Sequence, residues 1–167
     1  RWRTIYNGVD VKGITKNIDV ANEVTVRDRF NIPISSHVYL CVGRYVEEKC
    51  QSDIVHAMAN MDISDAYLIL VGWGPYEKRI KSIADEYGIG DRVIFTGRVP
   101  HEDIWSYYNA ADTFVSASST ESFGIVLVEA MAAGLPIVAT DIPGAREVLN
   151  AAKNGVERVP PNNPEKL

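Results

Sequence analysis

Short apolar runs alternate with helical patterns along most of this chain. The runs are nearly free of polar side chains, which is typical of buried strands. They lie at His37–Val42, Tyr67–Val71, Val93–Phe95, Thr113–Ala117 and Pro136–Ala139, with a weaker run at Val156–Val159. The stretches between them predict helices at Ser52–Asn60, Pro75–Tyr87, Glu102–Asn109, Gly124–Ala133 and Gly144–Leu149. Apolar strands separated by helices form parallel sheets that are covered on both faces, so we expect a doubly wound α/β domain of Rossmann type.

The two ends of the chain fall outside this alternation. We expect residues 1–36 to be an irregular interdomain segment that packs on the domain formed by residues 37–167. The proline-rich tail at 160–164 predicts a loop that leaves the domain. The chain begins at Arg1 rather than at a methionine, which suggests a fragment of a longer protein.

The composition is that of an ordinary globular domain, and it argues against several classes of protein. A net charge of -5 over 167 residues disfavours a general nucleic-acid binder, which is usually basic. The longest apolar run is interrupted by Glu129 and by 134–136, so we expect no membrane span. With two cysteines and no signal peptide at its start, the protein is expected to be cytoplasmic with reduced thiols.

The residues that follow the strands are small at four places. Ligands of doubly wound sheets bind beyond the carboxyl ends of the strands, so these places are where a site is expected. Gly43 follows the first strand, Gly72 and Gly74 follow the second, and Gly97 follows the third. Small polar residues and then Gly124 follow the fourth. Residues of this kind let a ligand approach the backbone closely.

A single charge, Glu129, interrupts the otherwise apolar segment 123–133. The segment predicts a helix that is apolar on every face and is therefore buried. An ionised carboxylate inside a protein costs several kcal/mol unless some group donates hydrogen bonds to it. That donor is either a ligand or, alternatively, an internal hydroxyl or a basic residue of the protein.

Glu121 lies eight residues before Glu129, near the start of the same predicted helix. Eight helical residues span about 12 Å and turn by about 80°. That separation is too wide and too skewed for two carboxylates that flank one bond, which need roughly 5–9.5 Å. We interpret them as gripping two hydroxyl-bearing parts of one long ligand, such as a nucleotide sugar, with its phosphates between them at the helix start. The alternative for Glu121 is an acidic residue that merely favours a helix N-terminus.

Arg44 and Lys49 follow the first strand and are the candidate cations. They would neutralise a diphosphate and stabilise its charge as it departs, or else they only keep the surface soluble. The sequence has no Asp-x-Asp pair for a divalent metal, and its three histidines are too scattered for zinc. Gly72-x-Gly74 lacks the third glycine of a dinucleotide fingerprint. We therefore expect neither a metal nor NAD.

Taken in order, these motifs resemble the C-terminal, donor-binding domain of GT-B glycosyltransferases of the large retaining family (glycosyl transferases group 1) that carries a Glu, seven residues, Glu signature. The family includes many mannosyl- and glucosyltransferases. The matching segments are Asn7–Asp10, Val42–Lys49, Gly72–Pro75, Phe95–Val99, Glu121–Pro136 and Asn154–Gly155. Two positions depart from the family pattern, because Cys50 and Ala145 stand where the family usually has glycine.

The resemblance implies a role for each residue of the site. Arg44 and Lys49 would hold the diphosphate and stabilise it as the leaving group. Glu121 would contact hydroxyl groups of the transferred sugar, and Glu129 would bind those of the ribose. The backbone near Val99 would meet the base. Further donor contacts would come from Gly43, Gly72, Gly74, Ser122, Phe123, Gly124 and Ile125.

The resemblance also implies what this chain would do and what it would lack. The family's enzymes transfer a hexose from a nucleotide sugar with retention of configuration and without a metal. The donor would be a GDP- or UDP-sugar, and mannose is our working assignment. The acceptor, a glycan or glycolipid, would bind an N-terminal domain that this chain does not contain. We therefore expect the chain to fold and bind donor weakly without turnover, and peripheral membrane association of the full-length protein is compatible with this role.

Two other functions remain open from the sequence. A nucleotide-sugar epimerase on the same scaffold would need further acid–base groups at the cleft, which the strand ends do not supply. A non-catalytic sugar-nucleotide module would be expected to have lost some of the four charged site residues. All four are intact in this chain.

Overall fold

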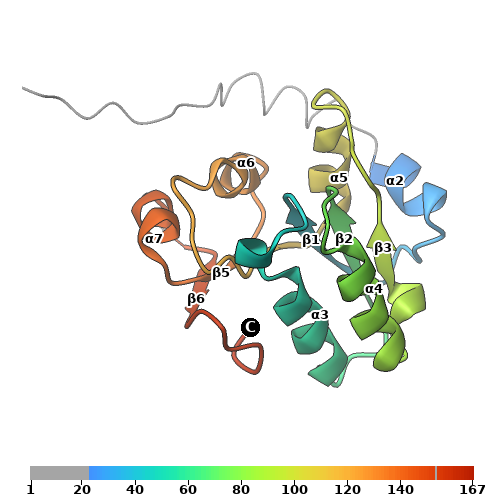
Figure 1. The fold of residues 1–167 in the computed structure, drawn as a ribbon. Helices are drawn as coiled ribbons and strands as arrows, with labels where there is room; N and C mark the ends of the chain where they lie inside the picture. The colour runs from blue at the N-terminus through green and yellow to red at the C-terminus, as the bar shows by residue number, and fades with distance from the viewer. Residues whose placement is uncertain (1–22, 153) are drawn as a thin grey trace, which may run out of the picture.

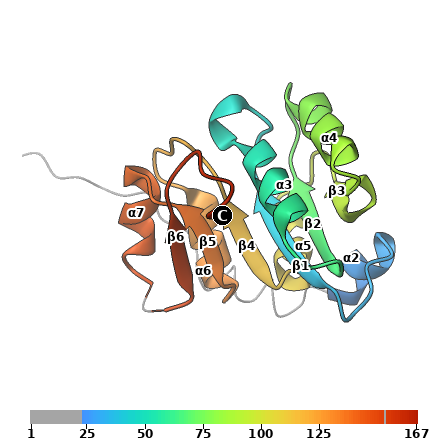
Figure 2. The ribbon, with the colours of Figure 1, turned by 90° about the horizontal axis from the view of Figure 1, so that it is seen from below.

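A computed structural model describes residues 23–152 and 154–167 (Figure 1). The segment Asn7–Asp10 and most of the expected interdomain segment lie outside these residues. Within them, the chain forms one parallel sheet in the order β3-β2-β1-β4-β5-β6 (Figure 2). The strands are β1 (His37–Val42), β2 (Ala66–Val71), β3 (Val93–Phe95), β4 (Thr113–Ser116), β5 (Ile137–Thr140) and β6 (Val156–Val159). This is the Rossmann strand order, which confirms the predicted doubly wound α/β fold.

Helices connect the strands and cover the sheet on both faces. They are α2 (Glu23–Arg29), α3 (Gln51–Asn60), α4 (Glu77–Glu86), α5 (Ile104–Ala110), α6 (Ile125–Ala132) and α7 (Pro143–Leu149), with short 3-10 turns at Glu47–Lys49 and Gly90–Arg92. The predicted strands and helices agree with these bounds to within two residues at each end. The tail after β6 consists of turns, as the prolines predict.

The two faces of the sheet have separate hydrophobic cores. In β1, Leu40 packs with α5 and α6 on one face, whereas Cys41 packs with α3 and α4 on the other. The same alternation places Ile69 and Leu70 of β2 in opposite cores. Figure 2 shows α3 and α4 together in front of the sheet. Strands that are buried on both sides explain why their sequences are continuous apolar runs.

Two predictions about the helices are wrong. Residues 23–29 form the helix α2 rather than irregular chain, and α2 packs beside α5 (Figure 1). Helix α6 is not buried on every face, because Ile125 is 41% exposed. An apolar pattern on all sides shows only that a helix lacks polar residues. Among the described residues, solvent reaches one side of α6.

The chain reverses direction across the sheet between β1 and β4. From β1 it moves outward through β2 to β3, then returns to β4 on the other side of β1. The crevice beyond the ends of β1 and β4 is therefore the topological switch point, where ligands of such sheets bind. The loops after these two strands carry Lys49 and Glu121.

Candidate functional site

The loops that follow β1 and β4 are tied together by a charge pair. Lys49 Nζ donates to Glu121 Oε2 in an ion pair that joins residues 72 positions apart. Both side chains are partly buried, at 25% and 19% exposure. Beside them, the Ser119 backbone N–H donates to the Glu48 carbonyl at 2.9 Å. The two charges that the sequence placed on separate motifs thus meet at the switch point.

The backbone holds Glu121 in a fixed place before α6. Gly124 adopts φ 74°, a left-handed conformation, at the start of the helix. Gly144, at the beginning of α7, packs so closely that an added Cβ would lie 1.9 Å from the Glu121 carbonyl oxygen. The Ser122 N–H donates to Glu121 Oε1 at 3.2 Å. Close packing of α7 against this loop therefore sets the position of the carboxylate.

Helix α6 begins immediately after the Glu121 loop and directs its N-terminus at the switch point. Its residue Leu127 donates its N–H to Gly124 at 2.9 Å, so the N–H groups that precede it form the open end of the helix. Together with the helix dipole, such groups favour an anion. The side chain of Phe123 packs against the hydrophobic core instead. The backbone N–H groups at the start of α6 are thus the feature of this segment that suits an anion.

The loop that carries Arg44 and Lys49 is anchored on the core by Tyr45. This tyrosine is 1% exposed, and its hydroxyl donates to the Leu70 carbonyl at 2.7 Å. Gln51 donates its side-chain N–H to the Arg44 carbonyl at 2.8 Å. Cys50 adopts φ 49°, so the cysteine takes the left-handed conformation that glycine would supply at this position. The departure from the family pattern therefore preserves the local backbone.

The side chain of Arg44 is exposed and lies beside an exposed aromatic ring. Its guanidinium carbon is 6.0 Å from the centre of the Trp73 ring, and Trp73 is 51% exposed. The backbones of the two loops are also joined, because Tyr45 donates its N–H to the Trp73 carbonyl at 3.0 Å. Arg44 thus lies beside Trp73 and outside the ion pair that engages Lys49.

Glycines bring the loops after β2 and β3 against the first loop. Gly72 has φ 147°, and an added Cβ would lie 1.9 Å from the Gly43 carbonyl oxygen. A Cβ on Gly74 would lie 2.3 Å from the Tyr45 carbonyl oxygen. Gly72 also donates its N–H to the Gly97 carbonyl at 3.1 Å, which aligns the loop that leads to Val99. The predicted strand-end glycines therefore hold the three loops together by backbone contact.

Glu129 is buried and has a hydrogen-bond donor within the protein. It is 8% exposed, and the Tyr108 hydroxyl donates to its Oε2 at 2.8 Å. Burial raises the pKa of Glu129, while the Tyr108 hydrogen bond and the nearby His101 act in the opposite direction. The internal hydroxyl that the sequence left as an alternative is thus present. Its bond occupies one carboxylate oxygen, so binding of a ribose by the other stays a prediction.

Tyr108 belongs to a row of aromatic rings that leads from the Val99 loop to the core. The rings of His101 and Trp105 are 5.8 Å apart, and Trp105 stacks on Tyr108 at 5.6 Å. Tyr108 in turn stacks on Phe114 of β4 at 5.9 Å. Burial raises the pKa of the Tyr108 hydroxyl well above its usual value, so it remains a donor to Glu129. These stacked rings fix the position of the Tyr108 hydroxyl that donates to Glu129.

The structure corrects the geometry that was expected between Glu121 and Glu129. Glu121 lies in the loop before α6, and only Glu129 is on the helix, so the spacing of eight helical residues does not apply. The two carboxylates nevertheless have different partners, Lys49 and Tyr108. Sequence reasoning did not identify Tyr108 or Gly144, because both act through contacts between segments that are distant in sequence.

No group of three or more His, Cys, Asp or Glu residues gathers to hold a metal ion among the residues that the structure describes. The same residues contain no helix that is both long enough and apolar enough to cross a membrane. Independence from metals remains a prediction.

The profile of the family "Glycosyl transferases group 1" matches residues 23–167. The chain belongs to this family. This group 1 domain has the Rossmann-like arrangement of the second half of GT-B enzymes, which confirms the resemblance found in the sequence.

Relatives of this group 1 domain include several transferases. A GDP-mannose-dependent alpha-(1-6)-phosphatidylinositol monomannoside mannosyltransferase of Mycobacterium tuberculosis is 32% identical over 147 residues, which cover 83% of this chain and 38% of the relative. The structure of sucrose-phosphate synthase from Thermosynechococcus elongatus matches 98% of this chain and 41% of its own, with 32% identity and a TM-score of 0.81.

A solved complex with a nucleotide sugar also matches. The structure of Anabaena HepE with UDP-glucose covers 98% of this chain and 44% of its own, with 26% identity and a TM-score of 0.82. The group 1 domain described here thus spans about two fifths of the length of the relatives it matches.

Proposed function

We propose that this chain is the nucleotide-sugar-binding half of a retaining glycosyltransferase. The observation that carries the proposal is the meeting of Lys49 and Glu121 at the switch point, in front of the open start of α6. A cation, an open helix N-terminus and a carboxylate in one crevice suit a diphosphate that is joined to a sugar. The enzyme would transfer a hexose, with mannose as our assignment, to a glycan or glycolipid acceptor.

Each charged residue has a distinct task in this proposal. Arg44 and Lys49 neutralise the diphosphate as the bond between it and the anomeric carbon of the sugar breaks and the electron pair leaves with the phosphate. Glu121 accepts hydrogen bonds from hydroxyl groups of the sugar. Glu129 accepts them from the ribose, with Tyr108 holding its other oxygen. No metal is required, because the two cations and the helix carry the neutralising charge.

The relatives support two classes of donor. The name of the mycobacterial relative specifies GDP-mannose, and the HepE structure contains UDP-glucose. The base would lie against the backbone near Val99. Contacts to backbone do not depend on side-chain type, so the side chains do not specify which base binds. We therefore propose a GDP- or UDP-sugar.

The rest of the enzyme would lie outside this chain. Residues 37–167 would form the donor domain and residues 1–36 the interdomain segment, with the acceptor site on an N-terminal domain. The full-length protein would work in the cytoplasm, and a glycolipid acceptor would bring it to the membrane surface. The isolated chain would bind donor but not transfer sugar.

Calorimetric titration with GDP, UDP and ADP tests the proposal. The wild-type chain should bind at least one of them, and Arg44→Ala and Glu129→Ala should each weaken binding by about tenfold or more, through loss of a charge-assisted contact. Arg79→Ala is the matched control, because Arg79 is an exposed arginine that lies 5.8 Å from the Tyr76 ring, outside the site. Equal affinities for all four proteins would refute the donor site.

A further inference from the structure

The ion pair between Lys49 and Glu121 is built into the fold rather than formed by chance on the surface. Each side chain is at most a quarter exposed. The loop of Lys49 is bonded to the loop of Glu121 through Glu48 and Ser119, and close packing of Gly144 fixes the Glu121 backbone. The two charges are therefore held together before any ligand arrives.

Both groups retain hydrogen-bonding capacity beyond the bond that joins them. An ammonium group has three N–H donors, and the Glu121 carboxylate engages one of those of Lys49. The other Glu121 oxygen accepts the adjacent Ser122 N–H at 3.2 Å and has lone pairs in reserve. A diphosphate at Lys49 would consequently stand close to the negative charge of Glu121, and the two anions would compete for one ammonium.

We propose that Glu121 makes the site select the nucleotide sugar over the bare nucleoside diphosphate that remains after transfer. This inference rests on the proposed function. When a sugar is attached, its hydroxyl groups donate to Glu121 and compensate for the competition over Lys49. When the sugar has left, Glu121 loses that compensation and only opposes the diphosphate. Re-formation of the Lys49–Glu121 pair then favours release of the product.

The test compares the affinities of the two ligands by calorimetry in wild type and in Glu121→Gln, with UDP, UDP-glucose, GDP and GDP-mannose as probes. Release of the Lys49 ammonium from the competing Glu121 carboxylate should tighten binding of the nucleoside diphosphate by about three- to tenfold. The same change should not tighten binding of the nucleotide sugar, because a neutral amide is a weaker partner for its hydroxyl groups. The affinity for the nucleoside diphosphate should therefore rise relative to the affinity for the nucleotide sugar.

Two controls separate this effect from a general change of charge. Glu48→Gln removes the same charge from an exposed residue next to Lys49, and it should change nucleoside diphosphate affinity by less than about twofold. In a Lys49→Gln background, Glu121→Gln should no longer tighten nucleoside diphosphate binding, because there is no ammonium to release. The midpoint of urea unfolding verifies that each variant folds.

Several results would overturn the inference. They are an unchanged or weaker affinity of Glu121→Gln for the nucleoside diphosphate, an equal gain in Glu48→Gln, and a gain that persists without Lys49. If wild type binds a nucleoside diphosphate while these results appear, the inference alone is wrong. If wild type binds none of the four probes, the proposed function fails and the inference fails with it.

Discussion

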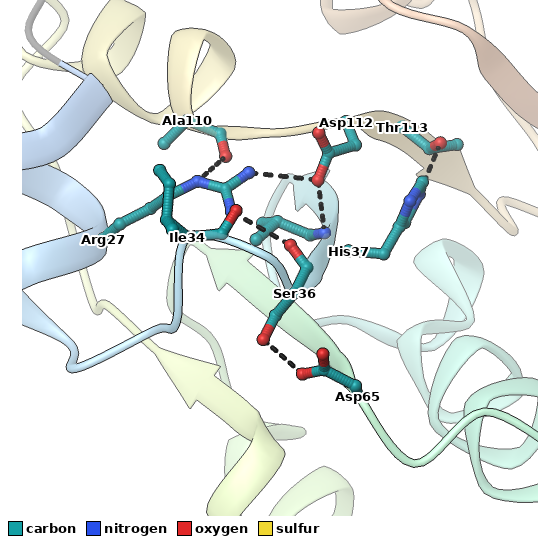
Figure 3. Close-up of polar contacts among 9 residues, drawn as sticks. Arg27, Ile34, Ser36, His37, Asp65, Ala110, Asp112 and Thr113 are labelled. Carbon is teal, nitrogen blue, oxygen red and sulfur yellow. Dashed lines mark hydrogen bonds and ion pairs between the residues drawn. The ribbon is translucent and has the colours of Figure 1, made fainter.

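Two charged clusters lie at opposite ends of the same two strands, β1 and β4. At the beginning of β1 and β4, Arg27 of α2 donates to the carbonyls of Ser36 and Ala110 and to the Asp112 carboxylate (Figure 3). At the ends of these strands, Lys49 binds Glu121. The first cluster contains a cation that is 4% exposed, whereas Lys49 is 25% exposed.

The two clusters differ in how much of their hydrogen-bonding capacity the protein itself uses. Besides its ion pair, Arg27 donates to backbone carbonyls at 3.0, 3.1 and 3.4 Å. Asp112 also accepts the Val38 N–H at 2.7 Å. Such a cluster joins α2, β1 and the end of α5. The Lys49–Glu121 pair retains donors and acceptors for a ligand. We infer that this remaining hydrogen-bonding capacity distinguishes a ligand site from a structural one.

The largest effect is expected when the structural cluster is broken. Arg27→Ala should lower the free energy of unfolding by about 3–5 kcal/mol, because the buried backbone carbonyls lose their donor and Asp112 loses its ion partner. Lys49→Ala should lower it by less than about 1 kcal/mol and should instead weaken nucleotide binding. Urea unfolding and calorimetry measure the two quantities.

Arg29→Ala, on the exposed side of the same helix, is the control for Arg27 and should cost less than about 1 kcal/mol. Equal losses of stability in Arg27→Ala and Lys49→Ala would show that the two clusters do not differ in kind.

An intermediate effect is expected from the glycine that supports Glu121. Gly144→Ala should lower the free energy of unfolding by about 2–3 kcal/mol, because its Cβ would overlap the Glu121 carbonyl, and nucleotide affinity should fall as the loop moves. Gly88→Ala is the matched control, because its Cβ would meet nothing within 4 Å and only φ 67° is unfavourable. That control should cost about 1 kcal/mol and leave binding unchanged. Identical losses in stability and binding for both variants would contradict the role of close packing.

The smallest effect is expected at Glu129 and depends on pH. Because its folded pKa is raised, its contribution to stability falls as the pH rises from the ordinary Glu value of about 4.3 through the raised value. Glu129→Gln should therefore match wild type near pH 4 and be more stable near pH 7 by about 0.5–1 kcal/mol, since burial of the charge is avoided. Urea unfolding at the two pH values measures this difference. A variant less stable than wild type at neutral pH would contradict the sign.

The fold and the predicted location of the candidate site follow from local patterns. Strands that are buried on both faces must be apolar throughout, so the first five strands were visible in the sequence, whereas β6 contains Glu157 and Arg158 and gave a weaker run. Glycines at the strand ends marked where a backbone approaches closely, and Gly72 and Gly74 indeed contact other backbones. Helix α2 was missed, because its seven residues are too few for a clear apolar period and its packing depends on Arg27.

The sequence by itself determined the parallel sheet, and it predicted the strand ends at which a ligand would bind and the charged residues that would contact it. These follow from periodicity and from residue type, which act over a few positions. Only the tertiary structure decided which charges meet: Lys49 with Glu121 across 72 residues, and Tyr108 with Glu129 across 21. It also placed Glu121 in a loop rather than on α6, because a left-handed glycine and the close approach of α7 fix the chain there. Such contacts depend on how the arrangement of the strands brings distant loops together, and no local pattern encodes them.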